Sequence, residues 1–403
     1  MNACRMGVVA ALLAAQLAAQ SSAPQAPVSL HSNSAQLSEN ATPRARADYV
    51  GDDVCSSCHQ EKAETFHRTA HYLTSRPPSQ DSILGSFSSD ANVLKTSNPN
   101  LFFRMDAKGP DFFQTAVQGR APYTESRTEK FGLVVGSGGK GQTYLFWEGE
   151  ELFQLPVSYW NKIGWVNSPG YRDGVANFDR PIIPRCLECH ATYFEALPPP
   201  PNRYSKTNST LGIACEKCHG PGRAHVEHYK SKTATGEPAI LNPAKFSRER
   251  QIDLCAWCHA GHGRPRQPWF SYVPGEPLDK YIEMPPPDPA APIDVHGSQV
   301  ELLKRSRCFE SSNMTCMTCH DVHTPQHDLA AFSQHCLGCH KVQSCGVFVH
   351  QGQKIANNCI DCHMPRQETS LIVFDVNGKK ASPAVRNHWI KIYSDRRDPS
   401  ELR

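Results

Sequence analysis

A five-residue pattern recurs along this chain: two cysteines separated by two residues, with a histidine directly after the second. Seven copies use fourteen of the seventeen cysteines. Random placement of the cysteines and histidines would give roughly 0.03 copies. In chain order, motifs 1 to 7 are Cys55, Cys58 and His59; Cys186, Cys189 and His190; Cys215, Cys218 and His219; Cys255, Cys258 and His259; Cys316, Cys319 and His320; Cys336, Cys339 and His340; and Cys359, Cys362 and His363.

The spacing within each motif suits covalent attachment of haem c. Two cysteines at this spacing can form thioether bonds to one porphyrin edge, and the adjacent histidine then binds the iron from the proximal side. A zinc finger would pair one such cysteine couple with a second couple, without a histidine after every second cysteine. A dithiol redox motif would occur once, near a βαβ pattern. The sequence therefore predicts seven haem c groups, attached through the fourteen cysteines and bound at iron by the seven histidines.

Histidine is also the expected second axial ligand, because methionine is scarce. Downstream of the N-terminal segment the chain has five methionines and, beyond the motifs and His31, eleven histidines. Histidine on both sides of the iron predicts low reduction potentials, whereas methionine raises the potential. The eleven histidines are His67, His71, His225, His228, His262, His296, His323, His327, His335, His350 and His388.

Three cysteines fall outside the motifs: Cys4, Cys308 and Cys345. Cys4 lies in the N-terminal segment that we expect to be a signal peptide. In an oxidising compartment the other two are predicted to form a disulfide. Two free thiols, or one thiolate close to a haem, are the alternatives, and spacing alone does not decide among them.

The N-terminal segment predicts export. Arg5 precedes an apolar stretch too short to span a bilayer, and small residues follow, so we expect a signal peptide over 1–23 and a flexible leader over 24–47. A retained membrane anchor is the alternative. We expect an exported protein, periplasmic or otherwise extracytoplasmic, with no transmembrane span in the mature chain. The formal net charge is +3 without a basic stripe, so nucleic acid is not an expected partner.

Periodicity divides the remaining chain into three parts. Residues 48–80 form a first haem-binding segment with a helix predicted over 59–73. Residues 81–180 contain no motif, and their apolar runs around Gly-rich turns predict β-hairpins over 100–117, 130–147 and 150–160. The stretch "GSGGKGQT" there resembles a phosphate loop superficially, but it lies between strand-like runs and is predicted to be a turn. Residues 181–403 hold the other motifs at short intervals and predict a six-haem domain.

Four stretches resemble the multihaem cytochrome c superfamily: "ACEKCHGPGRAHVEH" (214–228), "MTCMTCHDVHTP" (314–325), "CIDCHMP" (359–365) and "NHWIKI" (387–392). This superfamily includes cytochrome c nitrite reductase, octahaem hydroxylamine oxidoreductase and the tetrahaem electron carrier of ammonia oxidation. The resemblance implies a mainly α and irregular multihaem cytochrome c fold with a haem-packed core, to which 81–180 adds a β-rich insertion.

The resemblance also implies which histidines lie on the distal side of the irons. His225, His323, His350 and His388 match distal ligands of neighbouring haems, and His71 and His296 resemble the same role. A seventh distal ligand would be His262 or His228, unless one haem is five-coordinate. No CxxCK motif and no identifiable crosslinking tyrosine is present, so no catalytic residue carries over.

These features favour an electron-transfer protein whose redox protein partners, both donor and acceptor, are unknown. The alternatives are an oxidoreductase that acts on a small nitrogen or sulfur oxyanion at one open haem, and a structural module that docks partners through 81–180. Peripheral contact with a membrane is compatible with either function. Seven haems would add roughly −14 of propionate charge at neutral pH, which predicts salt-sensitive docking to a basic redox partner.

Overall fold

Alternating apolar and polar residues build the two largest sheets, which lie in the chain between motif 1 and motif 2. The computed structural model describes residues 46–231, 233, 235–237, 239–261, 263–285, 293–376 and 378–393. The first sheet is antiparallel, with the order β2–β3–β4–β5. Gly109 begins the two-residue turn between β3 and β4, where its positive φ of 60° suits a tight hairpin. These strands are β2 (Val93–Lys95), β3 (Leu101–Lys108), β4 (Asp111–Arg120) and β5 (Tyr123–Lys130).

The second sheet has the order β1–β6–β7–β9–β10, and β8 also pairs with β7. β1 lies in the first haem-binding segment, after α2 and η2, so its pairing with β6 attaches that segment to this sheet. The hairpins predicted over 100–117 and 130–147 are confirmed as β3–β4 and β6–β7. The strands are β1 (Ser75–Arg76), β6 (Leu133–Val135), β7 (Gly141–Glu148), β8 (Glu151–Gln154), β9 (Val157–Trp160) and β10 (Gly164–Asn167).

Both sheets share one core of side chains. Phe103 of the first sheet and Tyr144 and Phe146 of the second are each 0% exposed. The buried amide of Gln114 on β4 joins the two sheets. It donates to the carbonyl of Val157 on β9 (3.1 Å) and accepts from the Val157 N–H (2.9 Å). This region therefore completes its core with its own residues.

The helices are short, and most of them carry or flank a motif. The α-helices are α1 (Asp52–Ser56), α2 (Gln60–Phe66), α3 (Pro184–His190), α4 (Cys215–His219), α5 (Arg223–Lys230), α6 (Arg248–His259), α7 (Gln299–Lys304), α8 (Arg307–Glu310), α9 (Leu329–Leu337), α10 (Phe348–Gln351) and α11 (Cys359–His363). The 3-10 helices are η1 (Arg46–Asp48), η2 (Tyr72–Thr74), η3 (Pro243–Lys245), η4 (Leu278–Lys280), η5 (Cys316–Thr318), η6 (Val342–Ser344) and η7 (Gly352–Asn357).

The helix predicted over 59–73 is shorter than expected. α2 ends at Phe66, where the hydroxyl of Thr69 donates to the Phe66 carbonyl (2.7 Å) and replaces a helical partner. His71 therefore lies beyond the helix and not on its continuing face.

The expectation of a mainly α fold is wrong, because the described residues are 28% helix and 26% strand. Strands also occur in the part of the chain that carries motifs 2 to 7. There the described residues form four two-stranded antiparallel sheets. They are β11 (Ala191–Ala196) with β12 (Tyr204–Leu211), β13 (Arg264–Pro265) with β14 (Ile282–Glu283), β15 (Arg366–Glu368) with β18 (Ala384–Arg386), and β16 (Phe374–Val376) with β17 (Lys379–Ala381).

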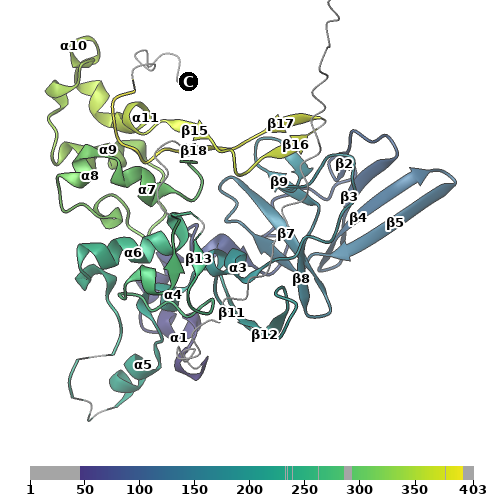
Figure 1. Cartoon of the computed structure of the whole chain (residues 1–403), viewed down its shortest axis with the longest axis horizontal. Helices are drawn as coiled ribbons and strands as arrows, with labels where there is room; N and C mark the ends of the chain where they lie inside the picture. The colour runs from purple at the N-terminus through teal and green to yellow at the C-terminus, as the bar shows by residue number, and fades with distance from the viewer. Residues whose placement is uncertain are drawn as a thin grey trace, which may run out of the picture. The chain divides into compact units, whose positions relative to one another are not determined.

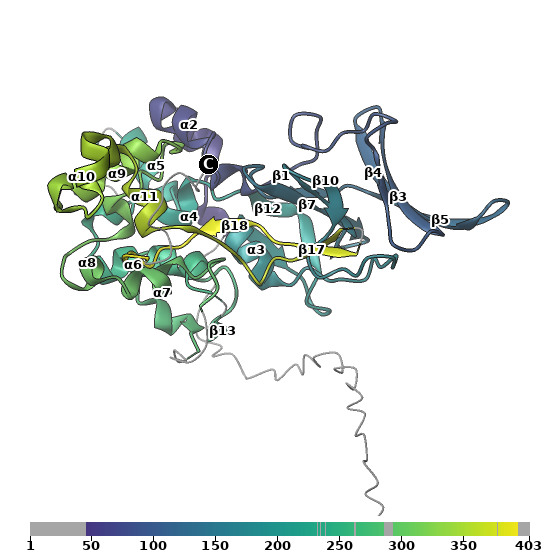
Figure 2. The same ribbon diagram turned by 90° about the horizontal axis from the view of Figure 1, so that it is seen from above.

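Segments far apart in the chain lie side by side where β16–β17 meets the second sheet (Figures 1 and 2). The rings of Trp160 on β9 and Phe374 on β16 have centres 4.7 Å apart. The side-chain amide of Asn167 on β10 donates to the carbonyl of Asp375 (2.7 Å). The C-terminal part of the chain thus packs on the β-rich part that precedes motif 2.

In the described part of the chain, no helix has the length and apolar character needed to cross a membrane. The predicted signal peptide over 1–23, nearly all of the leader, Cys4, His31 and His262 lie outside the described residues.

Candidate functional site

One turn of helix places the three side chains of a motif on the same side. In motifs 1, 5 and 6 the backbone N–H of the histidine donates to the carbonyl of the first cysteine, at 2.9, 3.0 and 2.9 Å. Motifs 2, 3, 4 and 7 lie inside α3, α4, α6 and α11. Residues i, i+3 and i+4 share one face of a helix. Both cysteines and the histidine of a motif therefore face in one direction.

All seven motifs face a single connected cavity of about 3250 Å³, which every motif cysteine and histidine lines. A pocket for one ligand of ordinary size has roughly 300–1,000 Å³, so this cavity is more than three times the upper value. Shared equally among the seven motifs, the volume is about 460 Å³ for each, within the range for one cofactor-sized group.

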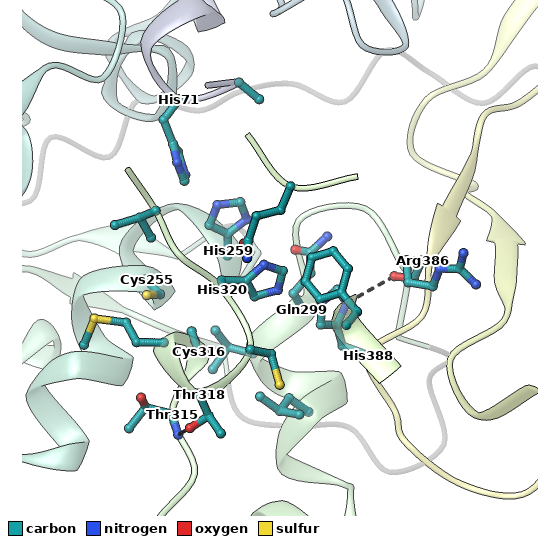
Figure 3. Close-up of a pocket in the computed structure, with 18 of the residues that line it drawn as sticks. His71, Cys255, His259, Gln299, Thr315, Cys316, Thr318, His320, Arg386 and His388 are labelled. Carbon is teal, nitrogen blue, oxygen red and sulfur yellow. Dashed lines mark hydrogen bonds between the residues drawn. The ribbon is translucent and has the colours of Figure 1, made fainter. Parts of the chain in front are cut away.

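Four motif histidines face a second histidine in this cavity, each time one that follows a different motif in the chain. In Figure 3, His71 points toward His259, and His320 lies beside His388. The pairs, by distance between ring centres, are His59–His225 at 6.3 Å, His71–His259 at 6.2 Å, His219–His323 at 6.1 Å and His320–His388 at 6.3 Å.

This separation fits an iron between two imidazoles. A five-membered ring with bonds of about 1.33 Å has its nitrogens about 1.1 Å from its centre. With metal–nitrogen bonds of about 2.0 Å on each side, the two ring centres are about 6.2 Å apart. Aromatic rings in direct contact have centres roughly 4.5–7 Å apart, so a single distance of 6.2 Å would not indicate a metal. The informative feature is that four separate pairs have nearly the same distance. The residues present therefore fit haem iron with histidine on both sides.

The structure distinguishes His71 from His67, the two histidines that follow motif 1 most closely in the chain. His71 faces His259, as described above. His67 forms a hydrogen bond with Asp52 through Nε2, and its ring stacks on Tyr72 with centres 4.1 Å apart. His67 is not part of the cavity lining, so His71 is the residue in position to bind an iron.

The other predicted distal ligands divide between those in the cavity and those outside it. His296 lines the cavity close enough to His190 for their charges to interact, which places it by motif 2. His350 is exposed and does not line the cavity, so its assignment as a distal ligand stays a prediction. His228 does not line the cavity either. Within the described residues, neither His340 nor His363 has a facing imidazole ring. Two further histidines, His327 and His335, line the cavity.

Burial favours the neutral imidazole of four cavity histidines. It lowers the pKa of His71, His190 and His388 to about 4, and nearby histidines contribute to the same shift. The pKa of His259 is also lowered, with burial as the main cause. Neutral imidazole is the form that binds a metal. These four histidines are therefore in the form that can bind iron at neutral pH.

Hydrogen bonds at Nδ1 orient several of the histidines, which leaves Nε2 directed to the cavity. An acceptor held in place by the fold thus sets the ring orientation, and no pattern in the sequence indicates which residue supplies it. The pairs are His190 with the Thr74 hydroxyl (2.8 Å), His219 with the Leu241 carbonyl (2.8 Å), His363 with the Lys391 carbonyl (3.0 Å) and His388 with the Arg386 carbonyl (3.2 Å).

The two variable residues inside a motif also have defined roles, which sequence reasoning missed. Lys217 of motif 3 and Glu188 of motif 2 are nearly inaccessible, with Nζ and Oε1 3.8 Å apart. Lys217 Nζ also lies 3.9 Å from the ring centre of Trp257 in motif 4 and donates to the Thr192 carbonyl (3.4 Å). A buried cation and carboxylate stabilise one another here, so this cluster joins motifs 2, 3 and 4.

Glu216, the other variable residue of motif 3, attaches the first haem-binding segment. Its carboxylate accepts from the backbone N–H groups of Val50 (2.9 Å), Gly51 (3.0 Å) and Gly222 (2.8 Å). A buried carboxylate with three such donors is well satisfied. It places motif 1 against motif 3.

Two cysteines outside the motifs and one buried arginine are also located. The disulfide predicted between Cys308 and Cys345 is absent: both side chains are free thiols that line the cavity. Arg185 Nη1 and Nη2 donate to the carbonyls of Trp257 (3.1 Å) and Gly261 (2.8 Å), so this guanidinium clamps α6.

Comparison with known proteins supports haem c chemistry. Residues 172–220, which contain motifs 2 and 3, match the family model described as cytochrome c554 and c-prime. The match supports a c-type cytochrome. Such cytochromes carry covalently bound haem, and they act as electron carriers. No curated protein and no solved structure matches the chain. Kinship with nitrite reductase or hydroxylamine oxidoreductase stays a prediction.

Proposed function

We propose that the chain is an exported cytochrome that transfers electrons along seven haem c groups, most of them bound by two histidines. The observation that carries this proposal is the common 6.1–6.3 Å separation of four histidine pairs inside one cavity lined by all seven motifs. An iron with histidine on both sides has no open position for a substrate, which favours electron transfer over chemistry. Bound haem c would supply the one-electron redox step.

The axial ligands follow from the pairs. Each motif histidine is the proximal ligand of its own haem. We assign His225 as the distal ligand at motif 1, His296 at motif 2, His323 at motif 3, His71 at motif 4 and His388 at motif 5. His350 remains the predicted distal ligand for one of the last two motifs.

Contacts between motifs imply one continuous row of attachment sites. α1 touches α4, α3 touches α6, α6 touches η5 and α9 touches α11. Lys217 connects motif 3 to motif 4. The ring of His320 in motif 5 lies 5.4 Å from the ring of Phe332 on α9, the helix that also carries Cys336 of motif 6. We infer the order 1–3–4–5–6–7, with motif 2 beside motif 4.

Haem content tests this proposal directly. The full chain, produced in a host that attaches haem c, is expected to contain seven haems per polypeptide by pyridine haemochrome and protein assay. Electron paramagnetic resonance of the oxidised protein should be dominated by low-spin signals. A haem-to-polypeptide ratio well below seven, in a protein whose motif cysteines all react with an alkylating reagent, would contradict the haem count. Cell fractionation tests export. Protein that stays in the cytoplasm with its N-terminal 23 residues uncleaved would contradict it.

A second function has one observation in its favour. Within the described residues His340 and His363 lack a facing imidazole, so one haem with an open distal position could act on a small nitrogen or sulfur oxyanion. A high-spin signal that shifts with nitrite, hydroxylamine or sulfite would favour this oxidoreductase, and its absence would favour the pure electron carrier.

Partner binding follows from the propionate charge that haem attachment would add. We expect a basic redox protein to dock at exposed haem edges, with a transfer rate that falls as ionic strength rises. Stopped-flow transfer to a purified basic cytochrome at two salt concentrations measures this, and equal rates would contradict it.

A further inference from the structure

Motif 3 carries two adjacent residues of opposite charge, and the fold directs them to opposite sides. Glu216 and Lys217 both lie between the two cysteines of this motif, and they are only 5% and 6% exposed. A buried charge acts strongly on its surroundings, because the protein interior screens charge much less than water does. The groups that each side chain contacts therefore decide which haem it would influence.

The Glu216 carboxylate faces motif 1. Two of its three donors are the backbone N–H groups of Val50 (2.9 Å) and Gly51 (3.0 Å). Gly51 is the N-cap of α1, the helix that carries Cys55 of motif 1. In the described part of the chain Glu216 forms no ion pair, so its hydrogen bonds stabilise the negative charge but no cation cancels it. A negative charge is thus buried beside motif 1.

The Lys217 ammonium faces motifs 2 and 4 instead. Its Nζ lies 3.9 Å from the ring centre of Trp257, a variable residue of motif 4, and 3.8 Å from the carboxylate of Glu188 in motif 2. Arg185 brings a second cation to the same place, because its guanidinium donates to the Trp257 carbonyl (3.1 Å) and the residue is 9% exposed. Among the residues that the structure describes, Arg185 forms no ion pair. Two cations and one carboxylate thus leave a positive charge between motifs 2 and 4.

Other charges close to these motifs are paired or exposed. Asp52 on α1 pairs with His67, and Arg250 pairs with Asp253 (2.6 Å) on the turn of α6 that precedes motif 4. Lys62 on α2 lines the cavity but is exposed, where water and salt screen its charge. The buried charges on the two sides of motif 3 therefore stay unbalanced.

We propose that these buried charges direct electrons from motif 1 through motif 3 toward motif 4. The inference rests on the proposed function, and it identifies residues that tune the haems. A nearby negative charge stabilises the oxidised iron and lowers the midpoint potential, whereas a positive charge raises it. Glu216 lowers the potential at motif 1, and Lys217 with Arg185 raises the potential at motif 4. At motif 3 the two adjacent charges oppose one another, so its haem has a potential between those two.

The order of reduction in the full haem-loaded chain gives the first test. Potentiometric titration followed by electron paramagnetic resonance measures the midpoint of each low-spin haem. His225→Ala and His71→Ala each remove one distal ligand, and the signals that they abolish are those of motifs 1 and 4. In wild type the haem at motif 4 should be reduced before the haem at motif 1. The reverse order would overturn the proposal.

Two variants that remove one charge each give the second test. Glu216→Gln should raise the midpoint at motif 1, and Lys217→Met should lower the midpoint at motif 4. Each change is expected to alter the equilibrium constant for reduction about tenfold, which is about 59 mV for one electron. Glu125→Gln on β5 and Lys95→Met on β2 are matched controls at exposed positions outside the cavity. Shifts of the same sign, or shifts no larger than those of the controls, would overturn the proposal.

A double variant distinguishes charge from packing. Lys217→Met with Glu188→Gln keeps the net charge of the buried cluster, so the midpoint at motif 4 should return to the wild-type value. A midpoint that stays low would show that lost packing causes the shift, and would overturn the proposal. Haem-to-protein ratio and far-ultraviolet circular dichroism confirm that each variant is folded.

Haem content keeps this inference apart from the proposed function. Seven haems per chain whose potentials do not respond to these charges would contradict the inference alone. A wild type without haem at motif 1 or motif 4 would contradict the proposed function as well.

Discussion

The β-rich part of the chain and the part that carries the motifs differ in what fills their interiors. Between the two largest sheets, Phe103, Tyr144, Phe146 and Val157 pack at 0% exposure. Among the later motifs the buried cluster around Val342 contains three residues, and the motif side chains surround a cavity of about 3250 Å³. The β-rich part fills its core with side chains. The motif part has a side-chain cluster around Trp257, but all seven of its motifs line a large cavity.

The difference identifies what holds each part together. Burial of apolar surface gives roughly 25 cal/mol per Å², and the β-rich part obtains it from its own residues. Around the cavity that surface is not covered by protein, so the stabilisation has to come from the groups attached there. The motif part is thus expected to depend on haem, and the β-rich part much less.

Removing haem should therefore have the largest effect, and it should be confined to one part. In chain produced without haem attachment, amide hydrogens of β3, β4 and β7 should stay protected, while those of α3, α4, α6 and α11 exchange rapidly. Hydrogen–deuterium exchange with mass spectrometry measures this, with the haem-loaded protein as reference. Equal loss of protection in both parts would break the comparison.

Removal of a core ring should have the converse effect. Phe103→Ala should cost about 3–5 kcal/mol of unfolding free energy, through loss of the contacts between the two sheets. Denaturant unfolding followed by far-ultraviolet circular dichroism measures the change, while the Soret band should keep its shape. Tyr123→Ala, at a position 86% exposed, should change the free energy by no more than about 0.5 kcal/mol. A changed Soret band in Phe103→Ala would show that the haem-binding part depends on the core of the β-rich part.

The buried ion pair offers a test inside the motif part. Lys217→Met leaves the Glu188 carboxylate without its cation and should cost about 3 kcal/mol of unfolding free energy. The double variant Lys217→Met with Glu188→Gln should recover most of this loss, because it removes the uncompensated charge. Thermal unfolding followed at the Soret band measures both. A double variant no more stable than the single one would show that packing, and not charge, is the reason.

A distal ligand should matter for one haem only. His71→Ala should convert the haem at motif 4 to a high-spin signal in electron paramagnetic resonance, because the imidazole that faces His259 is lost. His67→Ala is the matched control four residues away, since His67 bonds Asp52 instead. An unchanged spectrum in His71→Ala, or a high-spin signal in His67→Ala, would contradict the assignment.

The sequence predicted those features that depend on local spacing. A motif repeated seven times predicts its own chemistry, and alternation over 100–117 and 130–147 predicted hairpins that the structure confirms, because both signals lie within a few residues. The short strand pairs β15–β18 and β16–β17 carry no such signal, so the fold class was predicted with too little strand.

Contacts between residues far apart in the chain could not be predicted from the sequence. Which motif histidine His71 or His388 faces depends on how the chain crosses the cavity, and the spacing of histidines along the sequence does not indicate this. The resemblance named four of the facing histidines, yet not their pairs. Lys217 and Glu188 lay inside motifs, where variable positions carry no pattern. Lys140 lay in a stretch interpreted as a turn, which it is, but nothing local indicated that the turn borders the cavity.

The smallest expected effect concerns the partner of a proximal histidine, at the border between the two parts. Thr74 lies next to β1, and its hydroxyl bonds Nδ1 of His190 (2.8 Å). An acceptor at Nδ1 makes the imidazole a stronger donor to iron, so Thr74→Val should raise the midpoint potential of the haem at motif 2 and cost about 1 kcal/mol of stability. Thr65→Val, which removes a hydroxyl that bonds only carbonyls of its own helix, is the control. Potentiometric titration of both variants decides the question: equal midpoints would mean that the β-rich part holds motif 2 in place without tuning it.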